Sequence, residues 1–179
     1  MKSFLFSFLA ILFTGTAFSQ SSLPKAPGRT AFYAELGGPG ILFSANIDHR
    51  FKPSNLGWGG RIGLGFVTAD KEIPPATPGG YYDYRPASVV TVPLQVNYIF
   101  GKPSSPHTFE AGAGLTYVGQ QLNIVNFYGD KKSNLFGTFC FMYRRQPVDG
   151  GFMWRIGFTP LVAKGYIQPL GAVAVGYSF

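Results

Sequence analysis

The last nine residues, Gly171–Phe179, alternate strictly between large apolar and very small side chains. Strict alternation predicts a β-strand whose two faces meet different surroundings. A strand with one bulky apolar face and one face of tiny residues is typical of a membrane β-barrel, which has lipid outside and a narrow interior. The large residues of one parity, expected to face lipid, are Val173, Val175, Tyr177 and Phe179.

The composition agrees with this interpretation. Only 13% of the 179 residues are charged and 46% are hydrophobic, with 24 Gly, 18 Phe and 10 Tyr. This mixture is unlike that of a disordered chain or an ordinary soluble domain. Beyond the first twenty residues, no apolar run approaches the roughly 18 residues that a membrane-spanning helix needs. We therefore expect the chain to cross a membrane with strands.

Residues 1–19 have the pattern of a signal peptide. A basic residue at position 2 precedes the apolar stretch Phe4–Phe13, and Ala17–Ser19 forms a small-x-small cleavage site. These features predict cleavage after Ser19. The alternative is an N-terminal helix that is retained as an anchor.

The remaining chain divides into a periplasmic lead-in, residues 20–29, and one barrel domain, residues 30–179. Removing Lys2 with the signal peptide lowers the net charge from +7 to +6. For an exported barrel, this charge indicates attraction to anionic lipid and lipopolysaccharide rather than to nucleic acid. Cys140 is the one cysteine, so no intrachain disulfide can form.

Eight segments show period-two alternation with turn residues between them. The connections after the second, fourth and sixth segments are short, and long loops are expected at 69–87 and 119–133. This asymmetry is typical of outer-membrane barrels, and an even number of strands puts both termini in the periplasm. The expected fold is an all-β, eight-stranded antiparallel up-and-down transmembrane β-barrel. Its strands are Thr30–Gly38, Ile41–Phe51, Gly57–Thr68, Ser88–Phe100, His107–Val118, Asn134–Arg145, Gly151–Leu161 and Gly171–Phe179.

Charged residues within these strands share the inward parity. An arginine facing lipid at mid-bilayer costs about 2–4 kcal/mol, so the charges are expected inside, as pairs. The short turn after the second strand sets Asp48 opposite Arg61. A network of ion pairs could plug the interior or line a conduction path, and the narrow interior of eight strands favours the plug. Its expected members are Glu35, Asp48, Arg50, Arg61, Glu110, Arg144 and Arg155.

Small residues line the interior toward the loops, so this region is either filled by bulky neighbours such as Phe136 or open as a ligand pocket. Pro93 lies inside the fourth strand, where it predicts a bulge or a weakened pairing, since proline cannot donate to the ladder. The exposed-loop run Tyr81–Arg85 could form a recognition surface or pack over the barrel mouth.

No catalytic, cofactor or metal site is expected. His49 and His107 fall at strand ends on different hairpins, without metal-ligand spacing. A Ser-His-acid site would need a histidine at the opposite end of the barrel, and Cys140 has no histidine neighbour. The histidines are interpreted as interfacial polar residues.

The chain resembles, in architecture, the small eight-stranded outer-membrane barrels of the OmpA/OmpX type. More closely, it resembles an uncharacterised family of Bacteroidota outer-membrane barrel proteins, through stretches such as Pro93–Lys102, His107–Gly114 and Tyr143–Pro160. The closing Gly176–Phe179 is similar to the terminal signal read by the barrel-assembly machinery. The resemblance implies the barrel fold and a role of Tyr177 and Phe179 in assembly.

The sequence thus predicts a monomeric, integral outer-membrane protein with a filled interior and a structural or surface-interacting role, not an enzyme. One alternative is a lipid-modifying barrel enzyme of the lipid A deacylase or acyltransferase type. Another is a barrel that binds a small ligand, such as a lipocalin.

Overall fold

The computed structural model describes residues 28–75, 77, 79–81, 83–123 and 132–179. The expected signal peptide, 1–19, and most of the expected lead-in, 20–29, lie outside the described residues. Within the described ranges, no helix has the length and apolarity needed to cross a membrane. The regular structure there consists of strands and one 3-10 turn.

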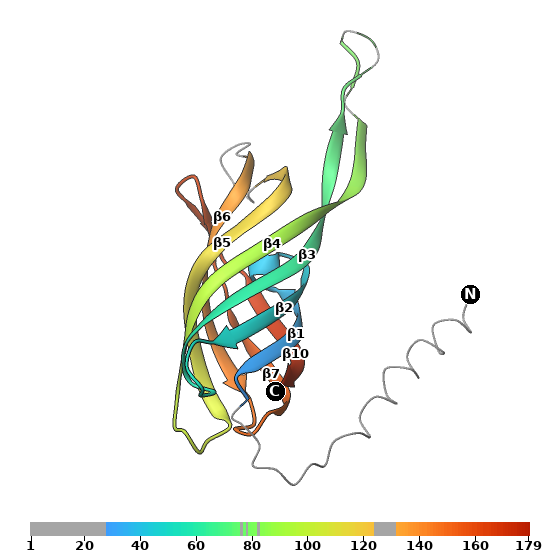
Figure 1. The fold of residues 1–179 in the computed structure, drawn as a ribbon. Coiled ribbons are helices and arrows are strands. Elements are labelled where there is room, and N and C mark those ends of the chain that lie inside the picture. Colours follow the sequence, from blue (N-terminus) through green and yellow to red (C-terminus); the bar gives the residue numbers. More distant parts are fainter. Residues whose placement is uncertain (1–27, 76, 78, 82, 124–131) are drawn as a thin grey trace, which may run out of the picture.

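In the described part of the chain, eight long strands form an antiparallel sheet that closes into a barrel, which confirms the predicted fold class (Figure 1). The seam between the first and last strands is present, with Phe32 opposite Tyr177. Two three-residue strands, β8 and β9, form a small hairpin between the last two long strands. The strands are β1 (Thr30–Gly37), β2 (Phe43–Arg50), β3 (Gly57–Ile73), β4 (Asp83–Gly101), β5 (His107–Asn123), β6 (Lys132–Arg145), β7 (Gly151–Phe158), β8 (Leu161–Ala163), β9 (Tyr166–Gln168) and β10 (Gly171–Ser178).

The two ends of the barrel differ (Figure 1). One end holds Thr30, Phe179 and the turns between β2 and β3, β4 and β5, and β6 and β7, and we call it the terminal end. The other end carries the long β3–β4 hairpin, and we call it the hairpin end. The predicted short turns all lie at the terminal end.

The β3–β4 hairpin continues well beyond its neighbouring strands (Figure 1). A loop over 69–87 was expected, and this is wrong, because the ladder runs on until Ile73 pairs with Asp83. The loop expected over 119–133 is shortened in the same way by the pairing of Asn123 with Lys132. Beyond the apolar band, both faces of a strand meet water, so the alternation that signals a strand disappears from the sequence.

The connection between β1 and β2 folds inward and fills the barrel at its hairpin end (Figure 1). It is a 3-10 turn, η2 (Gly38–Gly40), and all three residues are buried. The Thr91 hydroxyl donates to the Gly40 carbonyl at 3.0 Å, and the Thr116 hydroxyl donates to the Pro39 carbonyl at 2.7 Å. The inward threonines of β4 and β5 thus satisfy buried carbonyls of η2.

Ile41 was expected to begin the second strand and face outward, and this is wrong, since β2 starts at Phe43. Ile41 has φ 75° and ψ −71°, which are the angles of a γ-turn, and the Leu42 amide donates to the Gly40 carbonyl at 3.1 Å. This conformation is strained for a β-branched residue. Its side chain turns inward and packs against what we call the hairpin-end cluster, formed by Val89, Val118, Phe136, Leu161 and Ala163. This cluster and η2 occupy the region where the sequence left open a choice between filling and a pocket.

Burial along the long strands follows the predicted parity. On β10, Ala172 and Ala174 are buried while Val173 and Val175 are exposed. The seventh strand was expected to reach Leu161, but β7 ends at Phe158 and resumes as β8 in the same register.

Pro93 weakens the β3–β4 ladder without a bulge. The ladder pairs Ile62 with Leu94 and Gly65 with Thr91, and the two positions between these pairs are missing from it. The alignment of β3 with β4 is the same on both sides of the gap, so the register is unchanged. Of the two expected outcomes, the weakened pairing is the one found, because the absent proline N–H cannot donate to β3.

Candidate functional site

The barrel interior holds seven connected charged side chains, which we call the lumen network. They come from six of the eight long strands, and none is more than 2% exposed. Their signs alternate along the network. In order of contact, the members are Arg50, Asp48, Arg144, Glu110, Arg155, Glu35 and Arg61.

The first half of the network starts at the terminal end, where Arg50 is the last residue of β2. Arg50 forms an ion pair with Asp48. The other oxygen of Asp48 lies 2.5 Å from Nη1 of Arg144, and the same Nη1 lies 3.1 Å from Glu110 Oε2. Strands β2, β5 and β6 are therefore joined across the interior, although β2 is hydrogen-bonded to neither of the others.

The second half of the network continues from Glu110. Both of its carboxylate oxygens accept from Arg155 Nη1, at 2.7 and 2.9 Å. Arg155 Nη2 lies 2.6 Å from Glu35 Oε1, and the other oxygen of Glu35 pairs with Arg61. These are charge-assisted bonds from arginine, whose several N–H donors let one side chain contact two carboxylates.

Neutral amides complete the bonding at both ends of the network. Asn97 accepts from Arg50 at 2.5 Å. Asn46 accepts from Arg61 at 3.0 and 2.9 Å, and Gln95 accepts from Arg61 at 3.3 Å. Four arginines and three carboxylates leave the network with one positive charge in excess, and the amide oxygens stabilise the two terminal arginines without adding further charge.

Tyr33 packs between two of the arginines. The Arg155 guanidinium lies 4.5 Å from the centre of its ring and that of Arg61 lies 5.3 Å away, both in cation–π geometry. Tyr33 lies opposite Gly176 of β10, where an added Cβ would clash with the Tyr33 Cβ. The small residues of β10 therefore provide the space that Tyr33 occupies.

The register prediction is correct, since Asp48 lies opposite Arg61 in the β2–β3 ladder. The direct ion pair expected between them is wrong, because Asp48 pairs with Arg50 and Arg144 while Arg61 pairs with Glu35. Register fixes only the Cα positions. A long arginine side chain reaches past the residue opposite it to a carboxylate on another strand.

Sequence reasoning did not include Tyr33 or the three amides in this site. Their inward parity was visible in the strand pattern, but polarity alone gave no reason to connect them with particular arginines. Such contacts depend on which side chains meet across the closed barrel, and strands far apart in sequence decide this.

The other candidate residues lie elsewhere. Both histidines are on the outer face at the terminal end, where His49 Nδ1 lies 2.8 Å from the Thr30 hydroxyl. Cys140 is buried in the interior with its sulfur 3.8 Å from Glu110. Within the described residues, no three His, Cys, Asp or Glu side chains gather in a way that could hold a metal ion.

The fold and its interior define the class of closed, eight-stranded antiparallel β-barrels. No family model matches the sequence, and no curated protein is similar to it. Among solved structures, the N-terminal β-barrel domain of Pseudomonas aeruginosa OprF matches with a TM-score of 0.57 and 12% identity, over 86% of this chain and 99% of that domain. Ail, the attachment invasion locus protein of Yersinia pestis, aligns with a TM-score of 0.43 and 10% identity, over 84% of this chain and 94% of Ail.

Proposed function

We propose that this protein is an integral protein of the outer membrane of a Gram-negative bacterium, with a closed interior and a structural or surface-interacting role without catalysis. The observation that carries the proposal is the contrast between the two faces of the barrel. Phe32, Leu64 and Leu94 are among the many large apolar side chains exposed outside, at 52%, 62% and 58%, while the lumen network is buried inside. In water such an exterior would associate, whereas in a bilayer it is satisfied by lipid.

Aromatic side chains support the same proposal. Trp58, Tyr98 and Phe100 lie on the outer face toward the terminal end, and Tyr117 lies on the outer face toward the hairpin end. Aromatic rings at two levels of a barrel correspond to the two membrane interfaces. In this orientation, both termini lie in the periplasm and the β3–β4 hairpin projects outside the cell.

The hairpin is the part best placed for a surface interaction. Its outer edges are free in the ladders of the described residues, because β4 pairs with β5 only as far as Thr91 and β3 pairs with β2 only as far as Phe66. Tyr81, near the tip, is 97% exposed, and the neighbouring Asp83 and Arg85 side chains lie 3.6 Å apart. Unpaired strand edges beside aromatic and charged side chains can accept an extended segment of another protein.

The partners in this proposal are outer-membrane lipid, lipopolysaccharide and, during insertion, the barrel-assembly machinery, to which Tyr177 and Phe179 would present the terminal strand. No nucleic acid is among them, and the barrel acts as a monomer. A signal peptide at 1–19 and membership of a Bacteroidota barrel family belong to the same proposal.

Cell fractionation with gel electrophoresis of unheated and boiled samples tests the location. We expect the protein in the outer-membrane fraction and expect its extraction to need detergent. It should also migrate differently after boiling, because a closed barrel resists dodecyl sulfate until it is heated. Extraction into buffer without detergent would contradict the proposal and favour a soluble ligand-binding barrel. Turnover of lipid A by the purified protein would instead favour the lipid-modifying enzyme.

A further inference from the structure

On the outer face, residues of β3, β4 and β5 line an apolar groove of about 490 Å³. Two small residues of β5, Ala111 and Ala113, are part of its lining. On one side, Tyr98 lies opposite Ala111 and Val96 lies opposite Ala113. The groove exists because β5 carries alanine where its neighbours carry large side chains.

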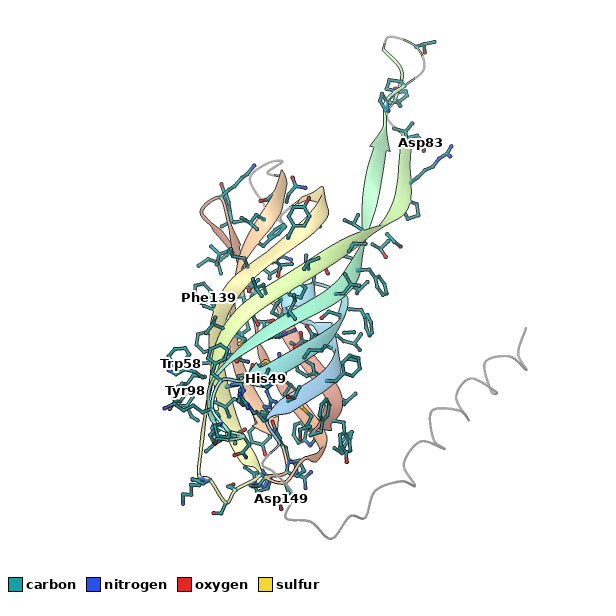
Figure 2. All side chains as sticks on the ribbon, viewed as in Figure 1. His49, Trp58, Asp83, Tyr98, Phe139 and Asp149 are labelled. Atoms are coloured by element: carbon teal, nitrogen blue, oxygen red, sulfur yellow. The ribbon has the colours of Figure 1, made fainter. Side chains whose placement is uncertain are left out.

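Beyond the alanines, the neighbouring strand β6 carries large apolar side chains. Phe141 lies opposite Ala111 and Phe139 lies opposite Ala113, and both phenylalanines are exposed. Neighbouring strands lie about 4.8 Å apart, so the large side chains on β4 and β6 are separated by about 10 Å, which leaves space for a slender apolar chain over the alanines. Figure 2 shows Trp58, Tyr98 and Phe139 together on this side of the barrel.

Aromatic rings stiffen the β4 wall. The Trp58 and Tyr98 rings meet edge to face at 5.2 Å, and the Tyr98 and Phe100 rings are 4.6 Å apart. A wall of mutually packed rings loses little rotamer freedom when something binds against it. The groove is therefore formed before it is occupied.

Basic side chains lie at the terminal end of β4, β5 and β6, below the groove. His107 is the first residue of β5 and pairs with Arg145, the last residue of β6. The β4–β5 ladder ends at the pair of Gly101 with Thr108, and Lys102 and His107 are the residues that follow on the two sides of that pair. His107 and Arg145 keep the outward parity of their strands, and Lys102 and His107 are exposed. In the described terminal-end turns, the acidic side chain is Asp149, between β6 and β7.

We infer that this groove binds one phospholipid with an anionic head group, from the leaflet at the terminal end. One acyl chain lies over Ala111 and Ala113, and the head-group phosphate contacts Lys102 and Arg145. Four to six residues separate His107 from the two alanines, about 14–20 Å along a strand. That span suits a head group at the interface and an acyl chain in the hydrocarbon core. The inference rests on the proposed function, because it requires the barrel to lie in a membrane.

Charge and shape make separate contributions to this site. A basic residue at the membrane surface raises the affinity for anionic lipid about fivefold. The groove contributes apolar contact for any diacyl lipid, whatever its head group. Variants of the basic residues should therefore remove the preference between lipids, and variants of the alanines should remove binding of both.

The test measures quenching of Trp58 by lipids with brominated acyl chains. Trp154 is the other tryptophan of the chain, and Trp154→Phe makes Trp58 the single tryptophan, whose emission is excited selectively at a wavelength that tyrosine does not absorb. The full barrel is inserted into phosphatidylcholine vesicles that contain either brominated phosphatidylglycerol or brominated phosphatidylcholine. We expect half-maximal quenching at a mole fraction at least about fivefold lower for brominated phosphatidylglycerol.

Four variants on this background separate the two contributions. Lys102→Gln with Arg145→Gln should make the two lipids quench equally, while Lys164→Gln, at the hairpin end, should change nothing. Ala113→Phe should fill the groove and weaken quenching by both lipids, while Ala45→Phe, an outward alanine of β2, should not. Ala45 lies opposite Ala34 and Leu64, away from the groove.

Insertion is scored in the same samples by heat-dependent migration, so the two proposals fail separately. A protein that does not insert contradicts the proposed function. A protein that inserts but is quenched equally by both lipids, or an Ala113→Phe variant that is quenched as before, overturns the lipid site. Self-association that Ala113→Phe abolishes, measured by energy transfer between labelled barrels, would overturn it in favour of a second copy of the chain in the groove.

Discussion

Glu110→Gln is the substitution that tests the lumen network most severely, because Glu110 lies at its centre. Glu110 accepts two bonds from Arg155, at 2.7 and 2.9 Å, and one from Arg144, at 3.1 Å. Glutamine keeps the size of the side chain but removes its charge. Arg144 then has only Asp48 as an acidic partner, and the excess positive charge of the buried network rises from one to two.

The expected loss of stability follows from this change. Breaking a buried ion pair by removing one partner costs about 3–5 kcal/mol. With a denaturant dependence of about 2 kcal/mol per molar urea, the unfolding midpoint should fall by about 1.5–2.5 M. Urea unfolding of the barrel in lipid vesicles, followed by tryptophan fluorescence, measures this shift. Adding Arg155→Met to Glu110→Gln returns the excess positive charge of the network from two to one, so the double variant should lose less than the sum of the two single variants.

A midpoint shift below about 0.5 M for Glu110→Gln would refute the reasoning. Strictly additive effects of Glu110→Gln and Arg155→Met would also refute it, since partners in direct contact must couple.

Four further experiments test other parts of the barrel. Leu94→Arg should cost about 2–4 kcal/mol in the same urea assay, because it places a charge on the outer face at mid-strand, whereas Tyr81→Arg at the hairpin tip should leave the midpoint unchanged. Gly176→Val should prevent closure of the barrel, because its Cβ would clash with the Phe32 carbonyl oxygen, and the absence of a heat-sensitive folded band on a gel would show this. Val175→Leu, whose side chain points outward, should fold normally. Phe179→Ala keeps the two backbone hydrogen bonds between Phe179 and Thr30, so it should change the urea midpoint little. It removes the terminal aromatic ring that the assembly machinery is proposed to read, so it should lower the amount of protein in the outer membrane. Normal membrane levels would contradict the assembly role of Phe179. Thr91→Val with Thr116→Val removes the hydroxyl donor of the buried Pro39 carbonyl and one of the two donors of the Gly40 carbonyl, which keeps the Leu42 amide. The double variant should lower the stability by about 2–4 kcal/mol, and a midpoint equal to that of the parent protein would show that η2 is held by other contacts.

The barrel was predictable because the two faces of each strand differ strongly, as a bilayer would require. Charge on the inner parity, as at Arg61 and Arg155, and large apolar residues on the outer parity, as at Val173 and Val175, carry that contrast directly in the sequence. The registers across short turns followed as well, since a turn of few residues leaves little choice of pairing.

What the sequence could not supply depends on contacts in three dimensions. The inward fold of η2 requires hydroxyl donors on β4 and β5 for its carbonyls. The sequence around Gly38–Gly40 does not indicate that Thr91 and Thr116 are these donors. The extension of β3 to Ile73 was missed because this part of the hairpin carries no two-residue alternation; on its partner β4, the neighbouring Arg85 and Pro86 are both exposed. The order of the lumen network depends on which arginines reach across the interior, and Arg61 passes Asp48 to contact Glu35.

We expect the lumen network, η2 and the hairpin-end cluster to close the interior of the barrel to ions. Single-channel recording of the purified protein in a planar lipid bilayer measures whether ions cross it. Gel analysis of the same preparation must show that the barrel is folded and inserted. A barrel with a closed interior should give no steps of ionic current above the background of the bare bilayer, at either polarity. Stable, stepwise conductance that scales with salt concentration would contradict a closed interior, because ions would then cross the space that the buried side chains are expected to fill.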